Sequence, residues 1–128
     1  MSIWKSSRRG KKPSGGRFWP FRKKRAYEIG SDPTRTKVAE KTTTRKKRLR
    51  GGSEMTQVLT ASHANLMIEK GKFKKSKILT VKENSANRHY VRMNVITKGA
   101  IVETEDGLAK VTSKPSRHGI VNAVLIKK

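Results

Sequence analysis

The sequence predicts a mainly β fold, a small antiparallel β-barrel of about six strands that follows a long, basic and extended N-terminal segment. Three observations lead to this prediction. Short β-rich runs recur in the C-terminal part of the chain, an Asp-Gly pair separates two of them, and the composition changes after Gly52. Residues 1–52 contain 18 Lys and Arg, 3 acids and 12 hydrophobic residues, whereas residues 53–128 contain 14, 6 and 30.

The N-terminal part has too little apolar surface to offset its conformational entropy, so we expect residues 1–52 to be disordered when alone. Within it, residues 22–29 are a candidate for a short helix that ends at Gly30, and residues 38–50 favour an extended chain. Residues 53–128 hold enough apolar side chains to fold. The sequence therefore predicts a basic extension at 1–52 and a barrel domain at 53–128.

Alternation of apolar and polar residues predicts several strands of the barrel, because successive side chains of a strand point to opposite faces. In residues 91–95 this alternation places Val91, Met93 and Val95 on one face. Residues 55–59 and 78–81 are shorter β-rich runs bounded by polar residues.

The last part of the chain carries a hairpin signal and a final strand. Asp106-Gly107 lies between two β-rich runs and predicts a hairpin, because glycine tolerates a positive φ. Residues 120–126 are continuously apolar except for Asn122, which is typical of a strand buried on both faces. Residues 84–87 and 98–99 predict turns.

Charge is the strongest clue to a partner. The chain carries 32 Lys and Arg against 9 Asp and Glu, a net charge of +23. Such an excess repels itself in a monomer, so a polyanion, most commonly nucleic acid, is the natural explanation. The absence of cysteine excludes disulfides, thiolate catalysis and cysteine-bound zinc. Because no apolar run suits a membrane span or a signal peptide, we expect an intracellular protein with no membrane contact.

The candidate nucleic-acid site is a set of basic clusters and glycines within residues 1–52. Clusters separated by Gly and Pro suit a thread that follows a phosphate backbone, although a solvated tail or a localisation signal would look alike. Gly15-Gly16 allow close approach to a phosphate. The candidate residues are Arg8, Arg9, Lys11, Lys12, Gly15, Gly16, Arg17, Trp19, Arg22, Lys23, Lys24, Arg25, Arg45, Lys46, Lys47, Arg48, Arg50, Gly51 and Gly52.

Two parts of this set allow alternative interpretations. The rings of Phe18, Trp19 and Phe21 could stack on unpaired bases, which RNA offers more readily than duplex DNA, or pack against protein. Residues 48–52 could clamp a phosphate where the thread enters the folded part, or serve as a hinge into the first strand. Both roles can hold together.

No catalytic or metal-binding constellation stands out. The three histidines lie far apart in the sequence and have no carboxylate at ligand spacing, so surface histidines explain them. Glu103, Glu105 and Asp106 flank the predicted hairpin turn, which fits a solvated turn. There is no Gly-x-x-x-x-Gly-Lys loop and no nucleophile elbow. We predict no enzyme, no metal and no cofactor.

Several motifs, in order along nearly the whole chain, resemble one family. They are Ser14-Gly15-Gly16-Arg17, residues 23–30, Thr36-Lys37, and residues 48–52, 84–87, 98–104 and 119–126. Together they resemble the eighth small-subunit ribosomal protein of the archaeal and eukaryotic (e) type, in its short archaeal form. One departure follows Gly52, where the family usually has Asn and basic residues and this chain has Ser53 and Glu54. The carboxylate of Glu54 would oppose a phosphate contact there.

The resemblance implies a cytoplasmic, structural constituent of the small ribosomal subunit that binds small-subunit rRNA through a basic extension and a β-barrel. It adds Lys37 to the candidate rRNA-binding residues. The implied partners are small-subunit rRNA and neighbouring small-subunit ribosomal proteins, with no homo-oligomer. A chromatin-like architectural DNA-binding protein would be equally basic and stays open as the alternative. An RNA-processing enzyme would need a catalytic constellation, and none is visible.

Overall fold

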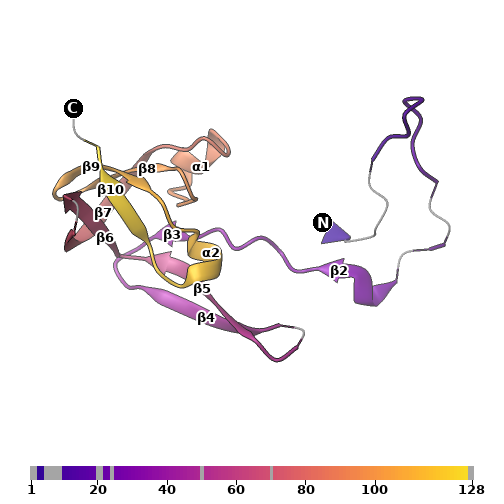
Figure 1. Cartoon of the computed structure of the whole chain (residues 1–128), viewed down its shortest axis with the longest axis horizontal. Helices are drawn as coiled ribbons and strands as arrows, with labels where there is room; N and C mark the ends of the chain where they lie inside the picture. Colours follow the sequence, from indigo (N-terminus) through magenta and orange to yellow (C-terminus); the bar gives the residue numbers. More distant parts are fainter. Residues whose placement is uncertain are drawn as a thin grey trace. The chain divides into compact units, whose positions relative to one another are not determined.

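The structure is a computed structural model that describes residues 3–4, 10–19, 22–23, 25–49, 51–69 and 71–126. The chain divides into two compact units, Met1–Pro33 and Thr34–Lys128. In chain order the elements are β1 (Ile3–Trp4), a 3-10 turn (Ala26–Glu28), β2 (Ile29–Gly30), β3 (Lys37–Val38), β4 (Thr43–Arg48), β5 (Glu54–Ala61), β6 (His63–Glu69), β7 (Lys72–Glu83), α1 (His89–Arg92), β8 (Ile101–Thr104), β9 (Gly107–Val111), α2 (Pro115–His118) and β10 (Asn122–Leu125) (Figure 1).

The predicted β-barrel is confirmed, and it is closed by five strands in the order β10-β6-β7-β8-β9. The pairings are antiparallel except that β10 runs parallel to β6. The Asp-Gly hairpin is also confirmed: Thr104 pairs with Gly107, whose φ of 128° requires glycine. The closed barrel thus has five strands, fewer than the six or so that the sequence predicts.

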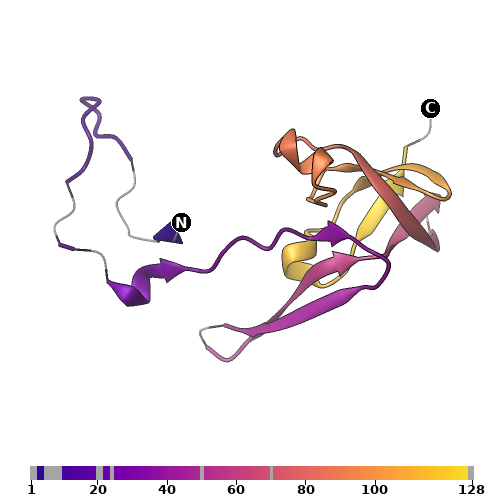
Figure 2. The same cartoon turned by 180° about the vertical axis from the view of Figure 1, so that it is seen from behind.

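The remaining strand of the C-terminal part, β5, lies outside the closed barrel. It pairs with β4 from Thr43 opposite Thr60 to Arg48 opposite Glu54, and with β3 in parallel. We call the β4–β5 hairpin the basic ribbon, and Figure 2 shows it beside the barrel. Because β3 and β4 pair with β5, the boundary between compact units precedes Thr34 and does not coincide with the composition change at Gly52.

Small and branched side chains fill the inside of the barrel. Each strand contributes at least one side chain that is almost completely buried, and alanines allow the strands to close around a narrow interior. These core residues include Ala64 and Leu66 on β6, Ile78 and Val81 on β7, Val102 on β8, Ala109 and Val111 on β9, and Ala123 on β10.

Three predicted strands are found, the last with a different environment. Residues 55–59 lie in β5, residues 78–81 lie in β7, and most of residues 120–126 lie in β10. The prediction that the last strand is buried on both faces is wrong, because Ala123 is buried in the core whereas Asn122 and Val124 are only partly covered. An apolar run alone cannot tell a strand paired at both edges from one covered on both faces.

The predicted strand at residues 91–95 is wrong. The backbone instead forms α1 and a turn, and the predicted turn at residues 84–87 continues into it. The side-chain oxygen of Asn87 accepts a hydrogen bond from the His89 N–H at 2.8 Å, and Asn94 adopts a positive φ of 49°. Asparagine favours both local conformations, and these override the apolar alternation.

The predicted helix at residues 22–29 shrinks to a single 3-10 turn. The helix does not extend to residue 29, because Ile29 and Gly30 form β2, which pairs with Trp4 and Ile3 of β1. The expectation of an extended chain at residues 38–50 is confirmed for Thr43–Arg48, which form β4, whereas residues 40–41 bend and Arg50 lies outside the described residues.

A buried hydroxyl links the segment before β3 to the basic ribbon. Thr36 is 1% exposed, and its Oγ1 donates a hydrogen bond to the Val58 carbonyl at 2.6 Å. We expect Thr36→Val to lower the free energy of unfolding by about 1–3 kcal/mol, since it leaves a buried carbonyl without that donor. Thr36→Ser, which keeps the hydroxyl, is expected to lose less. Chemical unfolding of both variants tests this, and equal losses would contradict a role for the hydroxyl.

Candidate nucleic-acid interface

Most of the positive charge of the chain has no acidic counterpart. Ion pairs between described side chains engage five of the nine acidic residues. These acids are Glu28, Glu54, Glu69, Glu103 and Asp106. With 32 Lys and Arg in the chain, the large remaining excess of cations gives a surface that suits a polyanion.

Two acids of the barrel, Glu103 and Asp106, pair with lysines of β7. Glu103 accepts hydrogen bonds from Lys82 at 3.0 Å and from Thr80 at 2.9 Å, and these bonds lower the pKa of Glu103. A hydrogen bond from Lys74 likewise lowers the pKa of Asp106. Carboxylates with lowered pKa stay ionised at neutral pH, which is the opposite of what a general acid needs. The arrangement agrees with a solvated turn.

The part of the chain that the structure describes contains neither a cluster of metal ligands nor a membrane-spanning helix. There, no group of three or more His, Cys, Asp or Glu side chains could hold a metal ion. Among the same residues, no helix has the length and apolar character needed to cross a membrane.

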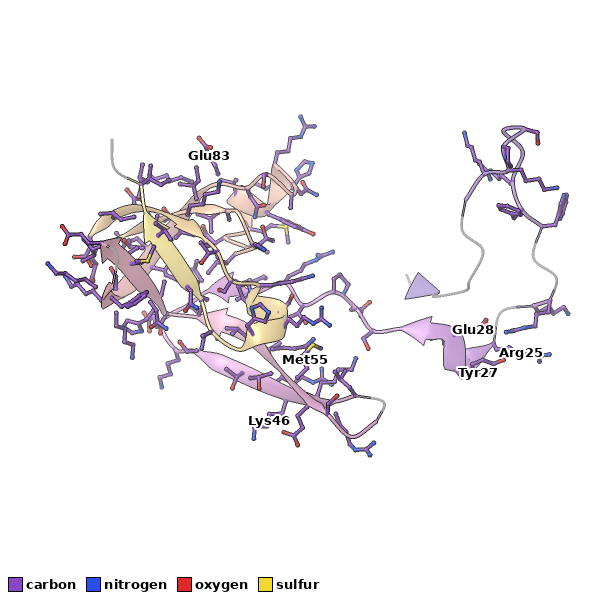
Figure 3. All side chains as sticks on the ribbon, in the orientation of Figure 1. Arg25, Tyr27, Glu28, Lys46, Met55 and Glu83 are labelled. Atoms are coloured by element: carbon purple, nitrogen blue, oxygen red, sulfur yellow. The ribbon has the colours of Figure 1, made fainter. Side chains whose placement is uncertain are left out.

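Strand β4 carries the densest described group of candidate residues. Its sequence, Thr-Thr-Arg-Lys-Lys-Arg, places Arg45 and Lys47 on one face and Lys46 and Arg48 on the other. The side chains of Arg45, Lys46 and Arg48 are exposed, whereas Lys47, opposite Met55, is half-buried. Lys46 and Met55 are labelled in Figure 3. The basic ribbon therefore offers cations on both of its faces.

The departure at Glu54 weakens this surface little. The carboxylate of Glu54 lies 4.0 Å from the Lys46 ammonium, and both side chains are mostly exposed, at 64% and 78%. An exposed pair of this kind contributes at most about 1 kcal/mol. A phosphate can therefore replace Glu54 as the partner of Lys46.

The glycines after β4 form the turn at the tip of the basic ribbon. The Leu49 N–H donates to the Ser53 carbonyl at 2.7 Å, and Gly51 and Gly52 have φ values of 88° and 87°. The hinge interpretation is therefore wrong, because the strands on both sides of the turn pair with each other. The phosphate clamp stays a prediction, and Arg50 lies outside the described residues.

In the first compact unit, the Ser-Gly-Gly-Arg motif closes a second tight turn, which we call the glycine turn (residues 11–17). Lys11 and Arg17 form an antiparallel bridge, and the Lys12 N–H donates to the Gly16 carbonyl at 2.7 Å. Gly15 has a φ of 82°, which favours glycine. Gly16 has no positive φ, and a Cβ there would meet only the Ser14 Oγ, at 4.0 Å. The chain's own packing therefore does not require glycine at position 16.

The 3-10 turn engages one of the candidate cations. The Arg22 Nη2 donates to Glu28 Oε1 at 2.6 Å, and the Arg25 N–H donates to the other oxygen at 3.2 Å. These hydrogen bonds, that from Arg22 first, lower the pKa of Glu28. The Arg22 guanidinium also lies 5.8 Å from the centre of the Tyr27 ring. Arg22 thus shapes the turn, whose Arg25, Tyr27 and Glu28 are labelled in Figure 3.

The other candidates fall into three groups. Lys23, Arg25 and Trp19 are exposed in the first unit, with Trp19 at 87%. Lys37 is exposed on β3, in the same unit as the basic ribbon. Outside the described residues lie Arg8, Arg9, Phe21 and Lys24.

Sequence reasoning missed the cations of the barrel itself. Residues 72–77 read Lys-Phe-Lys-Lys-Ser-Lys, and in β7 they place lysines and an exposed Phe73 on the barrel wall. The interleaving of an aromatic residue with lysines is typical of nucleic-acid surfaces and could have signalled this strand.

One known family matches nearly the whole chain. The sequence matches the family model of ribosomal protein S8e over residues 5–126 of its 128 residues. The chain belongs to the ribosomal protein S8e family. The resemblance that the motifs indicated is therefore confirmed, and the match extends through both compact units. As a member of the ribosomal protein S8e family, the chain is a structural constituent of the ribosome.

Proposed function

We propose that this S8e family member is a structural, non-enzymatic constituent of the cytoplasmic small ribosomal subunit that binds and stabilises small-subunit rRNA. Neighbouring small-subunit ribosomal proteins are further partners, and the protein acts as a single copy. The observation that supports this most is the basic ribbon, on which exposed Arg45, Lys46 and Arg48 occupy both faces of a hairpin. No observation favours the chromatin-like alternative.

The mechanism we propose is architectural. A two-stranded ribbon is thin enough to lie between RNA helices, and cations on both faces then neutralise phosphates that would otherwise repel one another. Phosphate contacts fix position without reading sequence, so the shape of the rRNA and neighbouring proteins can supply specificity. The cations of residues 1–52 act as one rRNA-binding extension, and the domain of residues 53–128, which contains the barrel, anchors it.

The glycine turn contributes a close approach to the RNA backbone. Because the chain itself has room for a side chain at Gly16, the missing Cβ leaves space for an outside partner beside the backbone there. We expect an RNA phosphate to occupy this space, contacted by the exposed cations of the turn.

Gly16→Ala tests the close approach. We expect the variant to fold like the parent and to bind a small-subunit rRNA fragment roughly tenfold more weakly, because a methyl group blocks the backbone contact. Gly10→Ala is the matched control, since Gly10 also has no positive φ and a Cβ at that position would meet no atom within 4 Å. Titration of a labelled fragment measures both affinities. Equal affinities of the two variants would refute the contact at Gly16.

Sedimentation tests the proposed function as a whole. In a sucrose gradient of cell extract, the protein is expected to travel with small subunits at moderate salt and to leave them at high salt. A parallel titration of duplex DNA and an rRNA fragment at equal salt is expected to favour the rRNA. Equal affinity for both, without sedimentation in small subunits, would instead support the DNA-binding alternative.

A further inference from the structure

One face of the barrel wall carries exposed apolar groups that the proposed phosphate contacts do not use. A groove of about 510 Å³ is lined by Asn65, Met67, Phe73, Ile120 and Asn122, among others. The Phe73 side chain is 69% exposed and Ile120 is 49% exposed. An exposed aromatic ring beside a groove indicates a binding surface, because a single domain gains nothing from leaving such a ring in water.

The strand register aligns this face in rows across β7, β6 and β10. These three strands are neighbours in the barrel (Figure 1). Phe73 of β7 lies opposite Met67 of β6, which lies opposite Val124 of β10. One row along, Lys75 lies opposite Asn65, which lies opposite Asn122. The next outward residue of β7 is Lys77, opposite His63. We call this three-row surface the aromatic face.

Its polar groups can recognise a nucleotide. Asn65 Nδ2 donates to Asn122 Oδ1 at 3.2 Å, which orients both amides and leaves each with further donor and acceptor capacity. Lys75 and Lys77 are exposed and lie two residues apart on one face, about 6.8 Å along the strand. An aromatic ring, an amide pair and a row of cations match the base, base edge and phosphates of RNA, respectively.

We propose that the aromatic face binds a short single-stranded segment of RNA. One unpaired base stacks on Phe73 beside Met67, its edge meets the amides of Asn65 and Asn122, and the phosphates follow Lys75 and Lys77. This inference rests on the proposed function and adds a second, stacking mode of contact to it. The RNA must be single-stranded there, because a base within a duplex has no free face for the ring.

The lysines and amides also decide between RNA and protein as the occupant. A protein-docking surface has an apolar centre depleted of lysine. Here the apolar row of Phe73 and Met67 adjoins a row of Lys75 with two amides, and Lys77 follows. The overall charge of +23 adds electrostatic complementarity to RNA.

The test titrates the full-length protein with a labelled oligouridine of about twelve nucleotides and with a duplex RNA of the same length. Phe73→Leu keeps apolar bulk but removes the aromatic ring. It is expected to bind oligouridine about tenfold more weakly, with an unchanged salt dependence, while duplex binding stays as in the parent. Lys75→Gln with Lys77→Gln is expected to weaken oligouridine binding with a shallower salt dependence. Leu108→Ala, an exposed apolar residue of β9 outside the groove, is the control and is expected to bind like the parent.

A spectroscopic readout reports stacking directly. In a background of Trp4→Phe and Trp19→Phe, the substitution Phe73→Trp places the sole tryptophan in the groove. Its fluorescence is expected to be quenched by oligouridine, because a stacked base quenches an indole ring, and to be unaffected by the duplex. Circular dichroism of each variant checks that the barrel is intact.

The outcomes separate this inference from the proposed function. If Phe73→Leu binds oligouridine like the parent and the tryptophan is not quenched, the inference is overturned, while salt-dependent rRNA binding through the basic ribbon still supports the proposed function. If Phe73→Leu keeps its RNA affinity but the protein no longer joins small subunits, the face docks a protein and the inference is likewise overturned. If every variant of both surfaces bound rRNA like the parent, that result would contradict the proposed function itself.

Discussion

Replacing Arg45, Lys46 and Arg48 together by glutamine is expected to weaken binding to a small-subunit rRNA fragment by roughly a hundredfold near 0.1 M salt. These side chains are exposed on both faces of the basic ribbon, and we expect each to contact a phosphate. Each contact releases a condensed counterion, so the slope of log K against log salt becomes shallower by about two. Titrations at several salt concentrations measure both quantities.

The matched control removes the same charge elsewhere. The control residues are exposed and lie outside the candidate set: Arg92, Lys98 and Lys110. Their joint replacement by glutamine lowers the net charge by the same amount as the ribbon variant. We expect this variant to lose much less affinity than the ribbon variant. If both triple variants lost affinity and slope alike, net charge alone would account for binding, and the basic ribbon would have no special role.

Two truncations are expected to differ sharply in stability. A chain that begins at Thr34 keeps the whole second unit, so its unfolding free energy is expected to remain close to that of the full chain. A chain that begins at Ser53 loses β3, β4 and the Thr36 hydroxyl bonded to Val58. It also exposes both paired edges of β5, so we expect it to lose about 3 kcal/mol or more, a large fraction of the stability of a small domain.

Thermal and chemical unfolding of the two truncated chains measure this difference. The chain from Thr34 is expected to melt cooperatively, and the chain from Ser53 to show a broad or much lower transition. Removal of residues 1–33 also removes 10 of the 32 Lys and Arg. We therefore expect the chain from Thr34 to bind rRNA more weakly than the full chain, although it retains the basic ribbon. Equal stability of the two truncations would show that residues 34–52 are independent of the barrel.

The barrel could be predicted from sequence because its strands obey simple rules. The β-rich run at residues 78–81 in β7 and the Asp106-Gly107 turn between β8 and β9 depend on local chemistry. The absence of a long amphipathic helix also left few alternatives to a β fold. These features depend on near neighbours in the chain, which a sequence displays directly.

The pairing of β4 with β5 could not be predicted in the same way. The side chains of Thr43–Arg48 are all polar or charged, so no apolar pattern marks β4 as a strand. Its order comes from backbone hydrogen bonds to β5 and from contacts such as that of Thr42 Oγ1 with Ser62 Oγ at 2.8 Å. For the same reason, composition alone placed the boundary of the folded part at Gly52.

The candidate site was predictable as a set of residue types and less so as an arrangement. Charge density identified Arg45–Arg48 and the glycine turn, but it gave Arg22 the same role as Lys23, although Arg22 is bonded to Glu28. It also overlooked Phe73, Lys75 and Lys77, because strand geometry, and not sequence proximity, places Asn65 and Asn122 beside them. Which residues share one surface depends on the pairing of strands that are far apart in the sequence.

The central claim is that the basic ribbon and the first compact unit contact small-subunit rRNA. Ultraviolet crosslinking of purified small subunits, followed by mass spectrometry of nucleotide-modified peptides, tests it most directly. The account predicts that peptides containing β4 and peptides containing the glycine turn both carry nucleotides from small-subunit rRNA. Recovery of the protein in the subunit with both sets of peptides unmodified, and with adducts confined to other parts of the chain, would contradict it.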